Sequence, residues 1–176
     1  MSQPSHGFIR SPAEIKILIL YVLRVVGAPI DSERLAELCL VDGGFNYFDF
    51  KLCLANLIEH ANVEENAGRL TLTAKGARAG EILEDDIPYS VKNRARKAAE
   101  PVGKELRRAA LIKANHEVTD TGVIVYLALN DGVGDIFDLK MLCSDEAEAK
   151  RIEKNFFERP ELYFNRFLGI LTEGEK

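Results

Sequence analysis

The chain has 176 residues, of which 47% are hydrophobic and 29% charged, and its formal net charge at pH 7 is −5. This composition is typical of a globular protein with one ordinary domain or two small ones. It excludes a membrane protein, because no apolar run approaches the ~20 residues that a bilayer requires. The three cysteines are isolated among apolar neighbours, which excludes a disulfide framework and indicates buried thiols in a cytoplasmic protein.

The first part of the chain contains the signals of three helices. Ser11, Pro12 and Glu14 supply a capping residue, a first-turn proline and an acidic residue three positions after the cap. Gly27 ends this first helix. Caps and apolar residues at helical spacing predict the other two. The three helices are expected over residues 11–26, 31–41 and 48–61.

Two short strands and a closing helix are predicted next. Leu70 and Leu72 alternate with threonines, which is the pattern of a half-buried strand. Residues 66–68 supply Asn and Gly for a turn that joins this strand to residues 63–65. Thr73 is a suitable cap for the following helix. Helix, hairpin and helix in so few residues are typical of a winged helix, a fold that is used mostly to bind nucleic acid.

The third helix is the candidate recognition element. Counted at ~100° per residue from a core-facing phenylalanine, its outward face presents Lys51, Leu52, Ala55, Asn56 and Glu59. Lys51 and Asn56 are of the types that contact DNA, with Asn56 as the base reader. Glu59 and an exposed Leu52 favour packing against another protein. Both interpretations stay open at this point.

Positive charge is concentrated after the hairpin. Arg69 and Lys75 stand where winged helices contact phosphates. Residues 88–115 hold eight Lys or Arg and two Asp or Glu, whereas residues 1–87 hold eight and thirteen. The basic residues either follow a phosphate backbone or form the solvated face of an amphipathic helix. The candidates for DNA contact in this segment are Lys92, Arg94, Arg96 and Lys97, followed by Lys104, Arg107 and Arg108.

These basic residues lie in a long helix that is expected from Ser90 to near Lys113. Its apolar stripe is too narrow for a helix that stands alone, so we expect it to lie across the winged helix or a partner subunit. Pro101 predicts a kink or a new helix start. Residues 85–88 mark the expected boundary between domains 1–86 and 87–176.

The C-terminal part is predicted to be a small antiparallel sheet followed by two helices. Residues 123–129 form a continuous apolar strand, and residues 135–143 alternate apolar and polar side chains after a Gly-containing turn, which predicts a hairpin. Residues 116–119 are the candidate for a third strand. The two helices are expected from a cap at Ser144 to residue 158, and from Pro160 to about residue 171.

The first helix carries apolar residues on two sides, although one apolar side is enough for a winged-helix core. Its second side needs a cover, and the candidates are the long basic helix, the C-terminal sheet and a second subunit. Two-fold homodimers are the commonest way to cover such surfaces. The expected dimer interface consists of Ile17, Leu20, Tyr21, Val123, Val125 and Leu127.

The chain does not have the residue patterns of an enzyme or a metal protein. His6, His60 and His116 are scattered, and none has ligand spacing to a cysteine or another histidine. Gly132 and Gly134 lie in a hairpin turn and not between a strand and a helix, so they do not form a phosphate-binding loop. We expect no catalytic residue, metal or cofactor.

Four segments resemble a bacterial winged-helix family that is known only as a domain of unknown function, number 4364. The similar segments are residues 16–21 in the first helix, residues 46–48 at the start of the third, residues 72–76 after the hairpin and residues 87–90 before the long helix. The resemblance covers nearly the whole chain. It implies a winged-helix fold and a transcriptional regulator, and it brings no known functional residues.

The sequence therefore predicts an α+β protein with an N-terminal winged helix-turn-helix, a long kinked linking helix, and a C-terminal antiparallel sheet with two helices. The expected function is a DNA-binding transcriptional regulator that acts as a homodimer on duplex DNA, with an unknown small molecule or protein as a further candidate partner. The alternative is a protein-interaction module whose winged helix binds protein.

Overall fold

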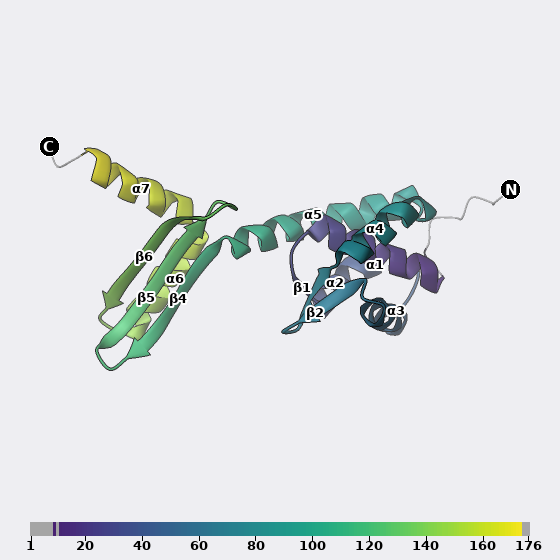
Figure 1. Cartoon of the computed structure of the whole chain (residues 1–176), viewed down its shortest axis with the longest axis horizontal. Helices are drawn as coiled ribbons and strands as arrows, with labels where there is room; N and C mark the ends of the chain where they lie inside the picture. The colour runs from purple at the N-terminus through teal and green to yellow at the C-terminus, as the bar shows by residue number, and fades with distance from the viewer. Residues whose placement is uncertain (1–8, 10, 174–176) are drawn as a thin grey trace. The chain divides into compact units, whose positions relative to one another are not determined.

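The computed structural model describes residue 9 and residues 11–173. In this part of the chain it contains seven α-helices and two three-stranded antiparallel sheets, so the α+β class is confirmed (Figure 1). The chain divides after Arg107 into two compact units. No helix among the described residues combines the length and the apolar character that crossing a bilayer requires.

The N-terminal unit contains the helix, hairpin and helix that the sequence predicts. Its sheet has the order β1-β3-β2, and the β2–β3 hairpin pairs Val63 with Leu72 and Asn66 with Arg69. The elements are α1 (Pro12–Val26), β1 (Ile30–Asp31), α2 (Ser32–Cys39), α3 (Tyr47–Glu59), β2 (Val63–Asn66), β3 (Arg69–Leu72), α4 (Ala74–Leu83) and α5 (Tyr89–Ala110).

Local capping chemistry explains where these helices begin. The Ser11 hydroxyl accepts a hydrogen bond from the Glu14 N–H, and the Glu14 carboxylate accepts one from the Ser11 N–H at 3.0 Å. The same reciprocal arrangement joins Asn46 and Asp49 at the start of α3. Thr73 caps α4 by accepting from the N–H of the third helical residue. Each cap satisfies backbone donors that the first helical turn leaves without partners.

The second apolar side of α1 is covered by the chain itself. Ile17, Leu20 and Tyr21 are all buried in the single chain. Gly80 of α4 lies against Leu20, and the buried side chains of α5 belong to the same core as α1. The prediction that these three residues form a dimer interface is therefore corrected, because helices of the same chain bury them.

The first nineteen residues of α5 belong to the N-terminal unit, so the two units meet after Arg107 and not at residue 86. Val91, Ala95, Ala99 and Gly103 are the buried residues of α5. They are small, which allows a close approach: a Cβ atom at Gly103 would lie 2.6 Å from the Val26 carbonyl oxygen. The helix is continuous through Pro101, without a second start.

The C-terminal unit is one sheet of order β4-β5-β6 with two helices after it. Its first strand is longer than the predicted residues 116–119, because the apolar alternation extends back through Ala114 to Ile112. The helix after the sheet is capped by Asp145 and not by Ser144, whose N–H and hydroxyl both donate to Glu148. The elements are β4 (Ile112–Thr119), β5 (Gly122–Asn130), β6 (Asp135–Cys143), α6 (Glu146–Glu158) and α7 (Pro160–Glu173).

The core of this unit lies between the sheet and α6. Val123, Val125 and Leu127 share one face of β5 and are buried together with Ala149 and Phe156 of α6. These three strand residues therefore form the interior of one chain, which corrects their expected place in a dimer interface. Strand alternation explains the arrangement, because every second residue of β5 has to face α6.

The β5–β6 turn depends on one carboxylate. Asp131 Oδ1 accepts hydrogen bonds from the Val133 N–H at 2.9 Å and from the Gly134 N–H at 3.0 Å. These backbone bonds, that of Gly134 first, lower the pKa of the Asp131 carboxyl. A pKa that is lower in the folded state gives stability that is present above the unfolded pKa and is lost as the pH falls through the folded pKa.

We therefore expect the Asp131 carboxyl carbon to titrate below the ordinary range of aspartate in an NMR pH series. Asp131→Ala should increase the mobility of residues 131–134, because the turn loses two backbone partners. Asp131→Asn is the matched control, since it keeps an acceptor oxygen without the charge. A midpoint at or above that of an unperturbed aspartate would show that the turn does not hold the carboxylate.

Candidate nucleic-acid interface

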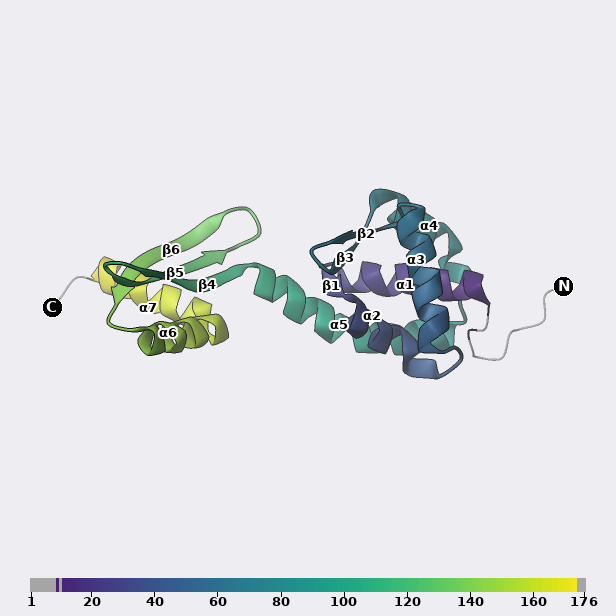
Figure 2. The ribbon, with the colours of Figure 1, turned by 90° about the horizontal axis from the view of Figure 1, so that it is seen from below.

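The α3 helix has one buried face and one exposed face. Its buried side chains are Phe50, Cys53, Leu54 and Leu57. Figure 2 shows α3 on the near side of the N-terminal unit. At ~100° per residue, the residues opposite the core form a ridge, and all of them are exposed: Phe48, Leu52, Ala55 and Glu59.

Lys51 and Asn56 flank this ridge on opposite sides. The Lys51 ammonium donates to the Ser32 hydroxyl at 2.7 Å and lies 5.5 Å from the centre of the Tyr47 ring, so it is anchored between α2 and α3. Asn56 is half-buried and lines a shallow hollow toward α1 with Lys16. The outermost side chains of α3 are therefore apolar, apart from Glu59, and the two polar candidates lie beside them.

Arg69 and Lys75 both lie on the hairpin side of the unit, and each has a partner within it. Arg69 Nη1 is 3.6 Å from Asp31 Oδ2, and both side chains are about half exposed. Lys75 Nζ donates to the His60 carbonyl oxygen at 2.7 Å, at the C-terminal end of α3. An exposed ion pair such as that of Arg69 contributes little to stability, so Arg69 can exchange its partner for a phosphate at little cost.

The basic residues of α5 are separated from this group. Figure 1 places α5 and α3 on opposite sides of α1, so one duplex along α3 does not also follow α5. Several of the α5 cations already have acidic partners within the unit. Lys92 lies 3.3 Å from Asp85 and 3.9 Å from Glu84, and Arg96 lies 3.2 Å from Glu100. Arg94 also interacts with another residue, and Lys97 is exposed.

The structure thus divides the candidate DNA contacts into two groups. Lys51 and Asn56 lie on α3, Arg69 lies in β3 and Lys75 in the first turn of α4, whereas the candidates on α5 lie on the opposite side of α1 from α3. Arg107, also considered on sequence grounds, donates to the Val25 carbonyl oxygen and holds α5 against the end of α1. Within the described residues, no three His, Cys, Asp or Glu side chains converge as metal ligands do.

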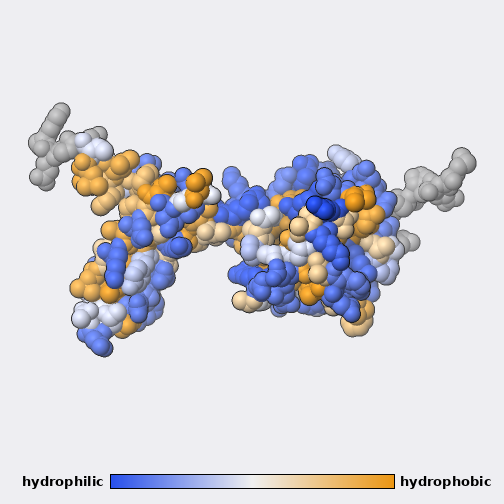
Figure 3. Space-filling model, viewed as in Figure 1, coloured by the Kyte–Doolittle hydropathy of each residue, from blue (hydrophilic) through white to orange (hydrophobic). Residues whose placement is uncertain are grey.

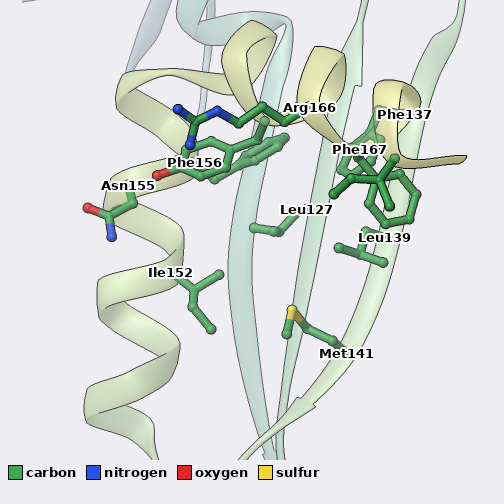
Figure 4. Close-up of a pocket in the computed structure, with 11 residues that line it drawn as sticks. Leu127, Phe137, Leu139, Met141, Ile152, Asn155, Phe156, Arg166 and Phe167 are labelled. Atoms are coloured by element: carbon green, nitrogen blue, oxygen red, sulfur yellow. The ribbon is translucent and has the colours of Figure 1, made fainter. Parts of the chain in front are cut away.

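The C-terminal unit contains an apolar groove that the sequence patterns did not predict. It has a volume of about 370 Å³ and lies between β6, α6 and α7. Figure 4 shows Leu139 and Met141 on one side, with Asn155 and Arg166 across from them. One signal in the sequence was available, because Phe137, Leu139 and Met141 alternate along β6 and all three line the groove.

Comparison with known proteins supplies the family. A model of the family described as Domain of unknown function (DUF4364) matches residues 15–171. The chain belongs to this family. No match was found among the curated proteins or among the solved structures. The DUF4364 match spans α1 in the N-terminal unit to α7 in the C-terminal unit, so both the α3 surface and the groove lie within the matched residues.

Proposed function

We propose that this DUF4364 protein is a dimeric DNA-binding transcriptional regulator and that its N-terminal unit is a winged helix. The observation that carries the proposal is the free face of α3 beside the β2–β3 hairpin, with Lys51, Arg69 and Lys75 around it. An α-helix with its side chains is about 10–12 Å wide, and the major groove of B-DNA is about 12 Å wide. The helix therefore fits the groove while the hairpin lies along the backbone.

The expected binding is weak without a specific site. The three cations beside α3 are few, and the protein has a net charge of −5. Each neutralised phosphate contributes roughly 0.9 to the slope of log K against log salt, so three contacts give a slope of about −3 for each subunit that contacts the duplex. Specificity then depends on the ridge of α3 and on Asn56, and apolar side chains there can contact thymine methyl groups.

The test is a selection from genomic fragments, followed by anisotropy titrations of the enriched duplex across a salt series. We expect the double variant Arg69→Ala, Lys75→Ala to weaken binding to every duplex and to reduce the salt slope by about two for each bound subunit, because each subunit loses two phosphate contacts. Lys97→Ala, on the far side of α1, is the matched control and should leave the slope unchanged. Absence of any enriched fragment, even at low salt, would contradict the proposal.

A second candidate function is a protein-interaction module that uses the same helix. The observation in its favour is the exposure of Phe48 at 70% and Leu52 at 57% on the ridge of α3. Apolar side chains of this size on a free helix face are typical of protein interfaces. A photo-crosslinking residue at position 48 separates the two functions: crosslinks to DNA support the regulator, whereas crosslinks only to protein support the interaction module.

A further inference from the structure

The groove of the C-terminal unit is open along α7. Its walls include Leu139 and Met141 of β6, Ile152 of α6, and Phe167 and Ile170 of α7. The α7 helix is held along one side, where Phe164 and Phe167 pack edge-on against Phe137, Tyr163 packs against Phe156, and Glu161 pairs with Arg108. The helix therefore forms a wall of the groove while much of its own surface has no contact.

The exposed surface of α7 is itself apolar. Ile170 is 73% exposed and Leu171 is 68% exposed, and Leu162 and Leu168 are exposed as well. Viewed down the helix axis at ~100° per residue, the apolar side chains of α7 occupy an arc of roughly 160°, with Ile170 at one end and Leu168 at the other. This arc is wider than the contact with Phe137 requires. Figure 3 shows apolar side chains gathered along α7 on the face in view.

We infer that a second copy of this chain covers this surface, with apolar side chains of the α7 helix of each copy in the groove of the other. The groove and the exposed helix lie on the same chain and adjoin each other. A two-fold contact brings each feature against its complement on the partner and covers both at once. A small ligand in the groove covers Ile170 but leaves Leu168 and Leu171 in water.

The size of the surface agrees with a stable dimer. A helix of 14 residues is about 21 Å long, and half the surface of such a cylinder is roughly 350 Å² at a width of 10–12 Å. The partner surface on which this helix packs, the groove included, buries a comparable area. Each copy contributes both, which gives roughly 700 Å² and approaches the ~800 Å² per partner of a standard interface.

The charges of α7 also permit contact between two copies. Between Leu162 and Thr172 the helix carries one charged residue, Arg166, and Glu161 before it is already paired with Arg108 at 3.3 Å. A two-fold contact places like residues near one another, so a strongly charged helix would repel its copy. The near absence of charge on the exposed arc removes this obstacle.

Sedimentation of the full chain tests the inference. We expect the protein to sediment as a dimer at a concentration of about 10 µM, because stable interfaces of this size have dissociation constants on the order of micromolar or below. Ile170→Asp and Met141→Glu alter the helix and the facing groove wall, and each should raise the dissociation constant roughly 30-fold or more. Ile82→Asp is the matched control, because Ile82 is an equally exposed apolar residue on α4 and should leave the dimer intact.

Circular dichroism of the variants separates loss of association from loss of folding, since both altered side chains are partly exposed in the single chain. A wild-type monomer at about 100 µM overturns the inference, as does a dimer that both variants retain. The inference rests on the proposed function only in taking the protein as a dimer. If sedimentation shows the dimer and the selection enriches no DNA, the interface stands and the regulator does not.

Discussion

Phe50→Ala is expected to lower the free energy of unfolding of the N-terminal unit by about 3–5 kcal/mol. Phe50 is fully buried, and it anchors α3 in the same core as Leu18, Val22 and Leu70. Its removal loses the transfer free energy of the ring and leaves a cavity among side chains that are fixed by three helices and the sheet. Urea denaturation followed by circular dichroism at 222 nm measures the change.

Phe48→Ala is the matched control for this measurement. Phe48 lies two residues earlier on the same helix and is largely exposed, so its replacement should change the free energy by no more than about 0.5 kcal/mol. Phe156→Ala should instead destabilise the C-terminal unit, whose core is separate. Equal effects of Phe48→Ala and Phe50→Ala would show that α3 is not oriented as described.

Gly76→Ala is expected to destabilise the N-terminal unit by about 3 kcal/mol or more, near the upper end of the range for overpacking. A Cβ atom at this position of α4 would overlap the carbonyl oxygen of Asn62 and would lie 2.8 Å from its carbonyl carbon. That oxygen already accepts hydrogen bonds from the N–H of Thr73 at 3.2 Å and from its hydroxyl at 3.1 Å. Moving the loop to make room for the methyl group breaks both bonds.

Gly169→Ala provides a control with the opposite sign. Gly169 lies inside α7, and a Cβ atom there meets nothing within 4 Å. Alanine in a helix interior is more favourable than glycine by about 0.5–1 kcal/mol. Thermal unfolding should therefore show that the same substitution lowers stability at position 76 and raises it at position 169. A stabilising Gly76→Ala would mean that the loop at Asn62 has another conformation.

The order of the elements followed from local chemistry in the sequence. Ser11 and Thr73 cap the helices at which they were predicted, and the predicted turn at residues 66–68 does connect β2 to β3, with positive φ at Ala67 and Gly68. Such signals act within a few residues of the chain. They do not specify the surface on which a helix packs, and for this reason the sequence alone left three candidate covers for α1.

The candidate site was predictable as a set of residue types but not as an arrangement. Periodicity placed Lys51 and Asn56 on the outer side of α3. In the structure Lys51 is exposed and Asn56 is half-buried. It could not indicate that Lys75 donates to the His60 carbonyl oxygen or that α5 and α3 lie on opposite sides of α1. These relations connect residues from different elements. The groove was missed for the same reason, because three elements have to meet before it exists.

The position of α5 has a consequence for synthesis of the protein on the ribosome. The N-terminal core is completed only by Val91, Ala95 and Ala99, which are made after all the elements of the sheet. At 5–20 residues per second, the 17 residues from Ile87 to Gly103 take roughly 1–3 s to be added. During this interval Ile17 and Tyr21 are on a nascent chain that has not yet produced its covering helix, and that is the stage at which they are available to a chaperone.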